Sequence, residues 1–269
     1  LPVTRSRFPA MLPSPGSLAI VTGPTAGIGR VFAQRLAARG HALLLVARDA
    51  ARLEALAAEL RAAHQVACQT MVADLASEAG MEALAQRLAA EPEVGVLVNN
   101  AGFGTKGKLH EAPLGPQMDM LRLHVLAPMR LTHAVLPRMV ARGSGWVINN
   151  SSVASFLYGP GNANYCATKA YLTRLTLSLD TELHRTGVVV QALCPGFTHS
   201  EFHARMRVDK GNIPSWLWLS PESVVDASLA ACANGGPAVL IPTWRYRVIT
   251  ALAQWVPHAL RRRMRGLSR

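Results

Sequence analysis

Short apolar segments alternate with longer segments of helical periodicity along most of the chain, and this alternation constrains the fold more than any other feature. The expected strands are residues 17–23, 42–47, 66–73, 94–100, 145–150 and 188–194, and the expected helices are residues 29–40, 50–64, 77–90, 117–140 and 163–185. The apolar segments lack a polar face, which indicates a parallel sheet covered by helices on both sides. The sequence therefore predicts a doubly wound α/β fold of about seven strands, with its ligand at the carboxyl ends of the strands.

No linker or low-complexity block divides the 269 residues, which favours one domain over residues 17–242. Residues 1–16 are expected to be an N-terminal arm, and residues 243–269 a basic, helical C-terminal extension. No apolar run approaches the ~20 residues of a membrane-spanning helix, and residues 1–16 lack the layout of a secretion signal. The four cysteines have no metal-ligand spacing. We expect a cytoplasmic protein with reduced thiols and no metal site.

The formal charge of +12 first suggests nucleic acid or an anionic membrane as a partner. Arg5, Arg7 and seven arginines between Arg245 and Arg269 lie in terminal stretches without acidic residues, so nine of the twelve excess charges are terminal. The body of the chain is nearly balanced and has no basic stripe interleaved with aromatic residues. The sequence therefore argues against nucleic-acid binding.

A glycine-rich turn, TGPTAGIG at residues 22–29, joins the first expected strand to the first expected helix. Gly23, Gly27 and Gly29 permit a tight turn and a close approach of the backbone to a pyrophosphate. The amide groups at the start of the helix, together with Thr25 and Ile28, would complete a phosphate site.

The stretch YCATK places Tyr165 and Lys169 four residues apart, on one face of an expected helix. A phenol with a pKa of ~10 needs a nearby positive charge in order to exchange a proton near neutral pH, and Lys169 could supply it. The pattern alone also fits an ordinary solvated helix face.

Five motifs occur in the order typical of one family. They are the glycine turn, Asn-Asn-Ala-Gly at residues 99–102 (with Asn100, Ala101 and Gly102), Ser152, the pair Tyr165 and Lys169, and Pro195-Gly196 followed by Thr198. In this order and spacing the chain resembles the short-chain dehydrogenase/reductase family, from Ser17 to about Ile241.

The resemblance implies a Rossmann-like fold and a ketoreductase-like, nicotinamide-dependent oxidoreductase. Ser152 would hydrogen-bond the substrate carbonyl oxygen, and Tyr165 would give that oxygen a proton. Lys169 would raise the acidity of Tyr165 and hold the nicotinamide ribose. The alternative for Ser152 is a serine that only forms a turn. Dimers and tetramers are common in the family, so a homo-oligomer is expected by analogy.

The choice of cofactor depends on the end of the second expected strand, where users of NAD carry an acid. Here Arg48 can pair with a 2′-phosphate in fork geometry, so we expect NADP(H). Asp49 follows and weakens this interpretation, and Arg48 could instead cap a solvated loop. Asp74 resembles the acid that contacts adenine in the family, or it caps the helix that follows.

Residues 197–221 contain no clear strand but several aromatic and aliphatic side chains. The family places a substrate lid here, and this content favours a hydrophobic carbonyl substrate, such as a 3-oxoacyl chain, a steroid-like ketone or an aryl ketone. The alternative is that these side chains only complete the core under a long loop.

His124 occupies the position of an asparagine that, in the family, helps hold a water molecule linking the catalytic lysine to solvent. Imidazole could fill this role with a titration near pH ~6.5 that asparagine lacks, so replacing His124 should change the acid limb of the pH profile. A histidine that only hydrogen-bonds locally is the alternative.

Two other functions are compatible with the sequence. One is a catalytically idle NADP(H) sensor, against which the intact Ser152, Tyr165 and Lys169 argue. The other is a peripheral membrane protein that uses apolar residues between Val248 and Val256 together with the arginines that follow. Pro257 interrupts that segment, so a subunit contact or a solvated tail is favoured over a membrane contact.

Overall fold

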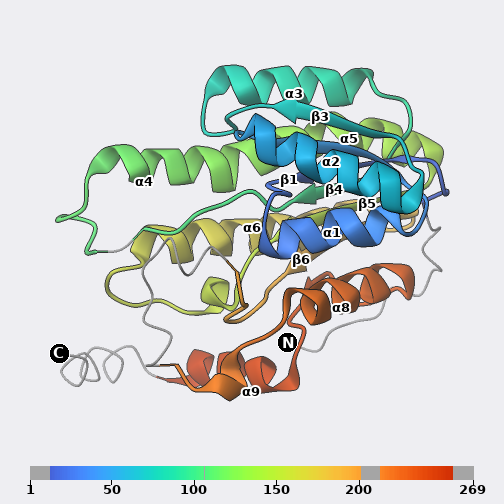
Figure 1. Cartoon of the computed structure of the whole chain (residues 1–269). Coiled ribbons are helices and arrows are strands. Elements are labelled where there is room, and N and C mark those ends of the chain that lie inside the picture. The colour runs from blue at the N-terminus through green and yellow to red at the C-terminus, as the bar shows by residue number, and fades with distance from the viewer. Residues whose placement is uncertain (1–12, 106, 201–212, 257–269) are drawn as a thin grey trace.

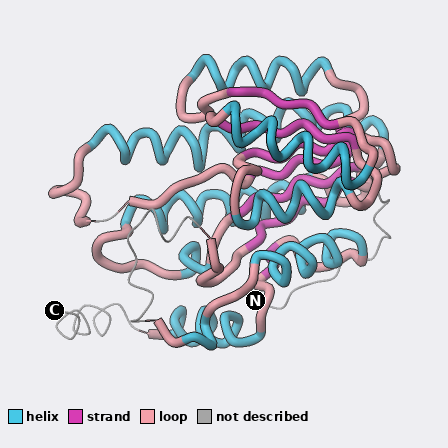
Figure 2. Tube along the Cα trace, in the orientation of Figure 1, coloured by secondary structure: helices cyan, strands magenta, loops and turns pink. Residues whose placement is uncertain are grey.

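The computed structural model describes residues 13–105, 107–200 and 213–256, and it contains a seven-stranded parallel sheet (Figures 1 and 2). The strands are β1 (Leu18–Thr22), β2 (Ala42–Ala47), β3 (Cys68–Val72), β4 (Val94–Asn99), β5 (Gly145–Asn150), β6 (Val188–Leu193) and β7 (Val239–Leu240). Their order in the sheet is β3-β2-β1-β4-β5-β6-β7. The predicted doubly wound sheet is therefore confirmed.

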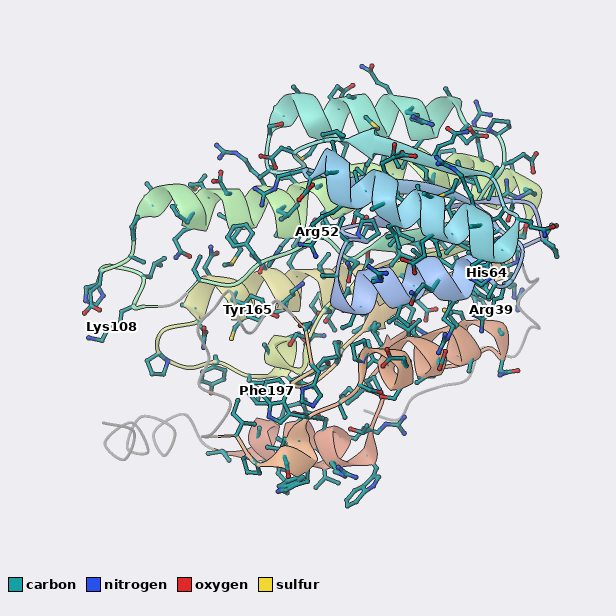
Figure 3. All side chains as sticks on the ribbon, viewed as in Figure 1. Arg39, Arg52, His64, Lys108, Tyr165 and Phe197 are labelled. Carbon is teal, nitrogen blue, oxygen red and sulfur yellow. The ribbon has the colours of Figure 1, made fainter. Side chains whose placement is uncertain are left out.

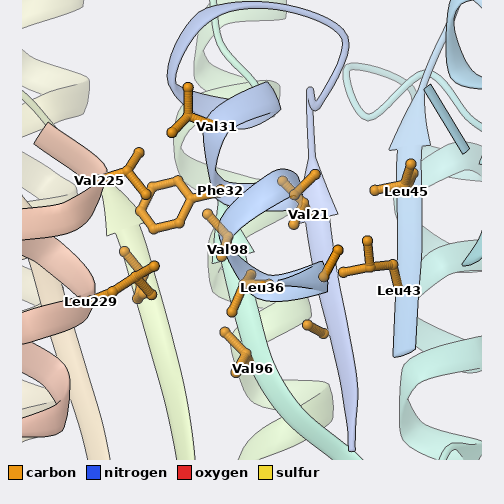
Figure 4. Packing of buried hydrophobic residues seen from close by; sticks show 14 of the residues in the cluster. Val21, Val31, Phe32, Leu36, Leu43, Leu45, Val96, Val98, Val225 and Leu229 are labelled. Atoms are coloured by element: carbon orange, nitrogen blue, oxygen red, sulfur yellow. The ribbon is translucent and has the colours of Figure 1, made fainter. Parts of the chain in front are cut away.

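Helices cover both faces of the sheet. They are α1 (Gly27–Ala37), α2 (Ala50–His64), α3 (Glu78–Ala90), α4 (Leu114–Leu121), α5 (Ala127–Arg142), α6 (Ala163–Glu182), α8 (Pro221–Ala233) and α9 (Trp244–Trp255). One apolar core joins the sheet to α1, α2 and α8, and Figure 4 shows Phe32 and Leu36 of α1 packed near Val225 and Leu229 of α8. A second core joins the other face to α3, α5 and α6. The strands are buried on both sides, which explains why they carry no polar face.

The strand order reverses between β1 and β4. The chain leaves β1 toward β2 and β3 on one side, and it returns from β4 toward β5, β6 and β7 on the other. A reversal of this kind leaves a crevice at the carboxyl ends of the strands, where ligands of such sheets bind. The glycine turn follows β1 and the Asn-Asn-Ala-Gly motif follows β4, so both lie at this crevice.

The single long helix expected over residues 117–140 is interrupted. A π-helical segment, Arg122–Leu126, separates α4 from α5 and contains His124. Pro128 has no N–H to donate to the carbonyl of His124 four residues earlier, which disfavours a regular α-helix here. Such π-segments are frequent at functional sites. The sequence also did not single out α8 or the short 3₁₀ helix Val153–Phe156.

The described parts of residues 197–221 are its two ends, since residues 201–212 lie outside the described residues. Thr198 and Leu219 form a parallel bridge, and the amide of Leu219 donates to the carbonyl of Phe197 at 2.8 Å. The ends of the expected lid are thus tied together beside the sheet. Residues 1–12 and 257–269, which belong to the expected terminal segments, also lie outside the described residues. Helix α9 lies within the segment for which a C-terminal helix was expected. Within the described chain, every helix is too short or too polar to cross a bilayer.

Candidate active site

A cavity of about 900 Å³ opens at the carboxyl ends of the strands. It brings together most of the residues singled out in the sequence, namely Gly23, Thr25, Gly27, Ile28, Asn100, Ala101, Gly102, Ser152, Tyr165, Lys169, Pro195, Gly196 and Thr198. Gly29, Arg48, Asp74 and His124 do not line it. Figure 3 labels Tyr165 on α6 and Phe197 after β6, two residues of the cavity wall.

The glycine turn requires glycine for two separate reasons. Gly23 and Gly27 have φ angles of 64° and 52°, in the left-handed region that side chains disfavour. A Cβ on Gly29 would overlap the carbonyl oxygen of Gly23 and the side-chain amide of Asn100. The turn is therefore packed directly against the motif that follows β4, and the start of α1 faces the cavity.

Hydrogen bonds from Thr22 and Asn100 join the two motifs. The hydroxyl of Thr22 accepts from the backbone amides of Asn100 and Ala101, at 2.9 and 3.0 Å. The side-chain amide of Asn100 donates to the carbonyls of Thr22 and Gly23, both at 3.0 Å, and its oxygen accepts from Asn150 at 2.8 Å. The carboxyl ends of β1, β4 and β5 thus form one rigid floor for the cavity.

Ser152, Tyr165 and Lys169 come from two neighbouring elements. Ser152 follows β5 and caps the 3₁₀ helix, where its hydroxyl accepts from the amide of Ala154 at 3.1 Å. Tyr165 and Lys169 lie on the first turns of α6, with the Lys169 Nζ 5.8 Å from the centre of the Tyr165 ring. Lys169 is buried, and its Nζ donates to the main-chain carbonyl of Asn150 at 2.7 Å.

Burial away from water is the largest cause of the pKa shifts of Tyr165 and Lys169. It raises the pKa of Tyr165 to about 12, against a lowering by the hydrogen bond with Ser152. It also lowers the pKa of Lys169 to about 8. In this structure burial outweighs the acidifying effect expected of Lys169, whose ammonium donates to the carbonyl of Asn150. Tyr165 holds its proton at neutral pH, as a group that donates a proton must.

His124 is buried behind this site. Its Nε2 accepts from the backbone amide of Phe103 at 3.1 Å, which assigns the proton to Nδ1, and Nδ1 donates to the hydroxyl of Thr168 at 3.1 Å. Its ring meets the Tyr165 ring edge-on at 5.9 Å. Burial, and then the charge of Lys169, hold the pKa of His124 well below its usual value. The expected titration near pH ~6.5 is therefore wrong, because a buried imidazole beside an ammonium stays neutral.

The residues expected to select the cofactor lie at the rim. Arg48 is exposed at the end of β2, and the carboxylate of Asp49 caps α2 by accepting from the amide of Arg52 at 3.0 Å. The sequence analysis did not single out Arg52, whose guanidinium donates to the carbonyl of Thr25 at 2.9 Å (Figure 3). The sequence feature that could have identified Arg52 is its position one helical turn after Asp49. Arg52 therefore contacts the glycine turn, whereas Arg48 is placed only by its position at the end of β2.

Asp74 stands in a turn before α3. Its carboxylate accepts from the amide of Ala76 at 3.0 Å, while Ser77 is the residue that caps α3. The alternative that Asp74 caps this helix is therefore wrong in detail, since it shapes the turn before the cap.

Tyr246 of α9 is a further residue that sequence reasoning missed. Its hydroxyl accepts from the amide of Phe197 at 3.0 Å and donates to the carbonyl of Leu217 at 2.8 Å. Its ring lies so close to Gly196 that a Cβ on Gly196 would overlap it. Tyr246 thus ties the C-terminal helix to the Pro-Gly loop and to the end of residues 197–221. No sequence signal relates positions so far apart.

The family can now be assigned. The model of the short chain dehydrogenase family matches residues 17–211. The chain belongs to this family. It is accordingly an oxidoreductase of the short-chain dehydrogenase/reductase type that acts on CH–OH and C=O groups.

Known proteins of this family resemble the chain over most of its length. A very-long-chain 3-oxoacyl-CoA reductase from Coprinopsis cinerea is 32% identical over 242 residues, which cover 87% of this chain and 70% of that protein. A short-chain dehydrogenase from Sphingobium yanoikuyae, solved with NADPH, is 34% identical with a TM-score of 0.80, covering 90% and 97% of the two chains. A short-chain dehydrogenase/reductase from Burkholderia phymatum, solved with NAD, is 25% identical with a TM-score of 0.78, covering 90% and 94%. For the present chain, membership of the family and these similarities identify the cofactor as a nicotinamide dinucleotide.

Proposed function

We propose that this short-chain dehydrogenase reversibly reduces the carbonyl group of a hydrophobic substrate with NADPH, using Tyr165 as general acid and base. The observation that carries the proposal is the arrangement of Ser152, Tyr165 and Lys169 along one wall of a cavity whose floor is the glycine turn. A protonated phenol, a hydroxyl and an ammonium beside one cavity suit the stabilisation and protonation of an alkoxide.

The residues of the chain have separate tasks in this mechanism. When bound, the cofactor supplies hydride to the carbonyl carbon. The hydroxyl of Ser152 hydrogen-bonds the carbonyl oxygen, and Tyr165 gives this oxygen its proton as negative charge develops on it. The ammonium of Lys169 stabilises the resulting phenolate. Its anchor on the carbonyl of Asn150, at 2.7 Å, holds it next to the ring.

The cavity also fits the dinucleotide. The left-handed turn at Gly23 and Gly27 places the start of α1, with Gly27 and Ile28, at the cavity where a pyrophosphate could bind its amides. We assign Thr25, Ile28, Ala101 and Gly102 to the cofactor wall, and Pro195, Gly196 and Thr198 to the nicotinamide end. Asp74 is assigned to the adenine.

The substrate part of the cavity is apolar, which supports a hydrophobic carbonyl compound. Its walls include Phe103, Leu157, Tyr158, Phe197 and Ile213. The similarity to a 3-oxoacyl-CoA reductase supports a 3-oxoacyl chain, and the apolar walls suit steroid-like and aryl ketones as alternatives.

Oxidation of NADPH, followed at its absorbance band against 3-oxoacyl thioesters, steroid ketones and aryl ketones, tests the proposal. Activity with at least one apolar class is expected. Inactivity with every class, combined with tight binding of NADPH, would contradict the proposal and favour the catalytically idle sensor.

Arg48→Ala should narrow the preference for NADPH over NADH about 10- to 100-fold, the value of one or two charge-assisted hydrogen bonds to the 2′-phosphate. The carboxylate of Asp49, which follows Arg48, is held by the amide of Arg52 at the start of α2. The measurement is kcat/KM with each cofactor. Arg39→Ala is the matched control, since Arg39 is an exposed arginine just before β2, at its other end. Equal kcat/KM for the two cofactors in the unmodified enzyme would show that the assignment of Arg48 is wrong.

His124→Leu should lower turnover and cost about 1–3 kcal/mol of stability, because the amide of Phe103 and the hydroxyl of Thr168 both lose their partner. His124→Asn keeps a donor and an acceptor and should stay active. Because His124 is neutral near pH 7, the unmodified enzyme and His124→Asn should show the same change of turnover with pH on the acid side of the profile. Thermal melting and turnover against pH decide this. If His124→Leu matched the unmodified enzyme in both melting temperature and turnover, His124 would not fill the role of the asparagine that the family carries at this position.

We further propose a cytoplasmic homo-oligomer. Its four cysteines are unpaired, which is typical of a reducing compartment. Exposed apolar side chains on α4, the π-segment and α5 offer a surface for a second copy, namely Leu114, Met118, Leu121, Leu126, Met129 and Val140. A molar mass from light scattering equal to that of one chain would contradict the oligomer. Labelling of the thiols in intact cells tests the compartment, because reduced cysteines of a cytoplasmic protein should react with a thiol reagent that enters the cell.

A further inference from the structure

Four large apolar side chains point away from the protein on α9. The exposed fractions of Trp244, Leu252 and Trp255 are 70%, 64% and 85%, and Val248 is 47% exposed. At about 100° per residue these four positions fall within about 80° of the helix circumference. The opposite side of α9 is buried through Tyr246 and Thr250. The side of α9 that faces solvent is therefore apolar, although the opposite side is the one that packs against the protein.

Arginines flank this face on both sides. Arg245 and Arg247 lie on either edge of the stripe, and they donate to the main-chain carbonyls of Trp216 and Ile241. From Arg245 to Arg269 the sequence has seven arginines and no acidic residue. An apolar stripe that contains tryptophan and is bordered by arginine is the pattern of a helix that lies in a membrane interface.

The place of α9 in the fold makes the stripe accessible. Figure 1 shows α9 at the lower edge of the molecule, outside the layers of helices that cover the sheet. Trp216, whose carbonyl binds Arg245, is itself 54% exposed. Through Tyr246 the helix is also tied to Phe197, which lines the cavity. The buried side of α9, opposite the stripe, therefore contacts the loop that lines the cavity, and the stripe itself faces away from it.

A second copy of the chain is the less suitable occupant. A two-fold contact through α9 would bring this face against itself, together with Arg245 and Arg247 of each copy, for which α9 offers no acidic partner. Four apolar side chains are also far fewer than the ~20–30 residues that each partner contributes to a stable interface. Anionic lipid headgroups, in contrast, complement the arginines while the acyl region receives the apolar stripe.

We propose that the exposed face of α9 docks the enzyme on an anionic bilayer surface. The apolar side chains Trp244, Val248, Leu252 and Trp255 enter the headgroup region, and Arg245 and Arg247 at the borders of the stripe lie next to the lipid phosphates. The sequence alone favoured a subunit contact or a solvated tail; we prefer the bilayer because the exposed helix offers two arginines and no acidic residue to a second copy.

Sedimentation with vesicles tests the docking without reference to catalysis. The full chain is mixed with vesicles of phosphatidylcholine alone, or of phosphatidylcholine with phosphatidylglycerol. We expect binding to the anionic vesicles that weakens as salt is raised, and little binding to the neutral ones. The double variant Leu252→Gln, Trp255→Gln should bind at least about tenfold more weakly, because it removes two of the four inserted side chains.

The matched control is the double variant Val72→Gln, Leu109→Gln, which alters two equally exposed apolar residues, each 57% exposed, that lie outside α9. It should sediment like the unmodified protein. Docking is refuted if the unmodified protein stays in solution with anionic vesicles, or if the α9 variant binds them as well as the control does. If the α9 variant instead lowers the molar mass from light scattering, the face is a contact between copies and the proposal is wrong. Because NADPH oxidation is measured separately, failure of docking and failure of the proposed catalysis are distinguishable.

Discussion

Tyr165→Phe should lower turnover by roughly 10²–10⁴-fold or more, the range that follows from the loss of a general acid. The substitution removes only the hydroxyl group. The ring keeps its packing against His124, whose centre lies 5.9 Å away, and its place near the Lys169 Nζ. Burial raises the pKa of Tyr165 to about 12, so the unmodified enzyme enters the reaction with the phenol protonated. The variant has no proton to give.

The measurements for Tyr165→Phe are steady-state turnover with the best ketone of the panel and binding of NADPH by fluorescence. Binding should survive, since the glycine turn and Lys169 are unchanged. Tyr171→Phe is the control, because it makes the same change on α6 outside the cavity. Unmodified turnover in Tyr165→Phe would exclude Tyr165 as the proton donor.

Much of the fold followed from local patterns in the sequence. The six strands expected in the sequence lie within two residues of β1 to β6, because buried parallel strands must be apolar throughout. Most motif positions could be predicted in the same way, because each motif follows an expected strand and the carboxyl ends of parallel strands meet at one edge of the sheet. The interruption at His124 was missed, because helical periodicity does not reveal how one proline shifts hydrogen bonds in the preceding turn.

The contacts of the site could not be derived from the sequence. Tyr246 reaches Phe197 across a sequence separation of 49 residues, and Lys169 takes the carbonyl of Asn150. Main-chain amides and carbonyls carry no residue-specific signal, so no sequence pattern reveals either contact. The pKa shifts of Tyr165 and Lys169 could not be predicted for a related reason: spacing on a helix gives the distance between two groups but not their burial, and burial dominates both pKa values.

Lys169→Met should lower turnover about 10²–10³-fold, the typical effect of losing one preorganised electrostatic contact to the developing charge. It should also raise the KM for NADPH, because Lys169 is proposed to hold the nicotinamide ribose. The fold should tolerate the change. Burial lowers the pKa of Lys169 from 10.5 to about 8, so the unfolded chain binds this proton more tightly than the folded protein does. Keeping the charged lysine buried therefore costs roughly 3 kcal/mol below pH 8, and the cost disappears as pH rises from about 8 to 10.5. Methionine avoids this cost, which offsets the lost hydrogen bond to Asn150.

The pH profile separates this role of Lys169 from a structural one. In the unmodified enzyme, kcat/KM for the ketone should fall as pH rises through about 8, because the free enzyme then loses the ammonium. Lys169→Met should be slow at every pH and should lack this limb, since the next group, Tyr165, titrates near 12. Lys108→Met makes the same chemical change at an exposed lysine and should keep both the rate and the limb (Figure 3). If Lys169→Met retains the limb near pH 8, another group produces it. If it also retains the rate, the ammonium takes no part in the reaction and Tyr165 acts without it.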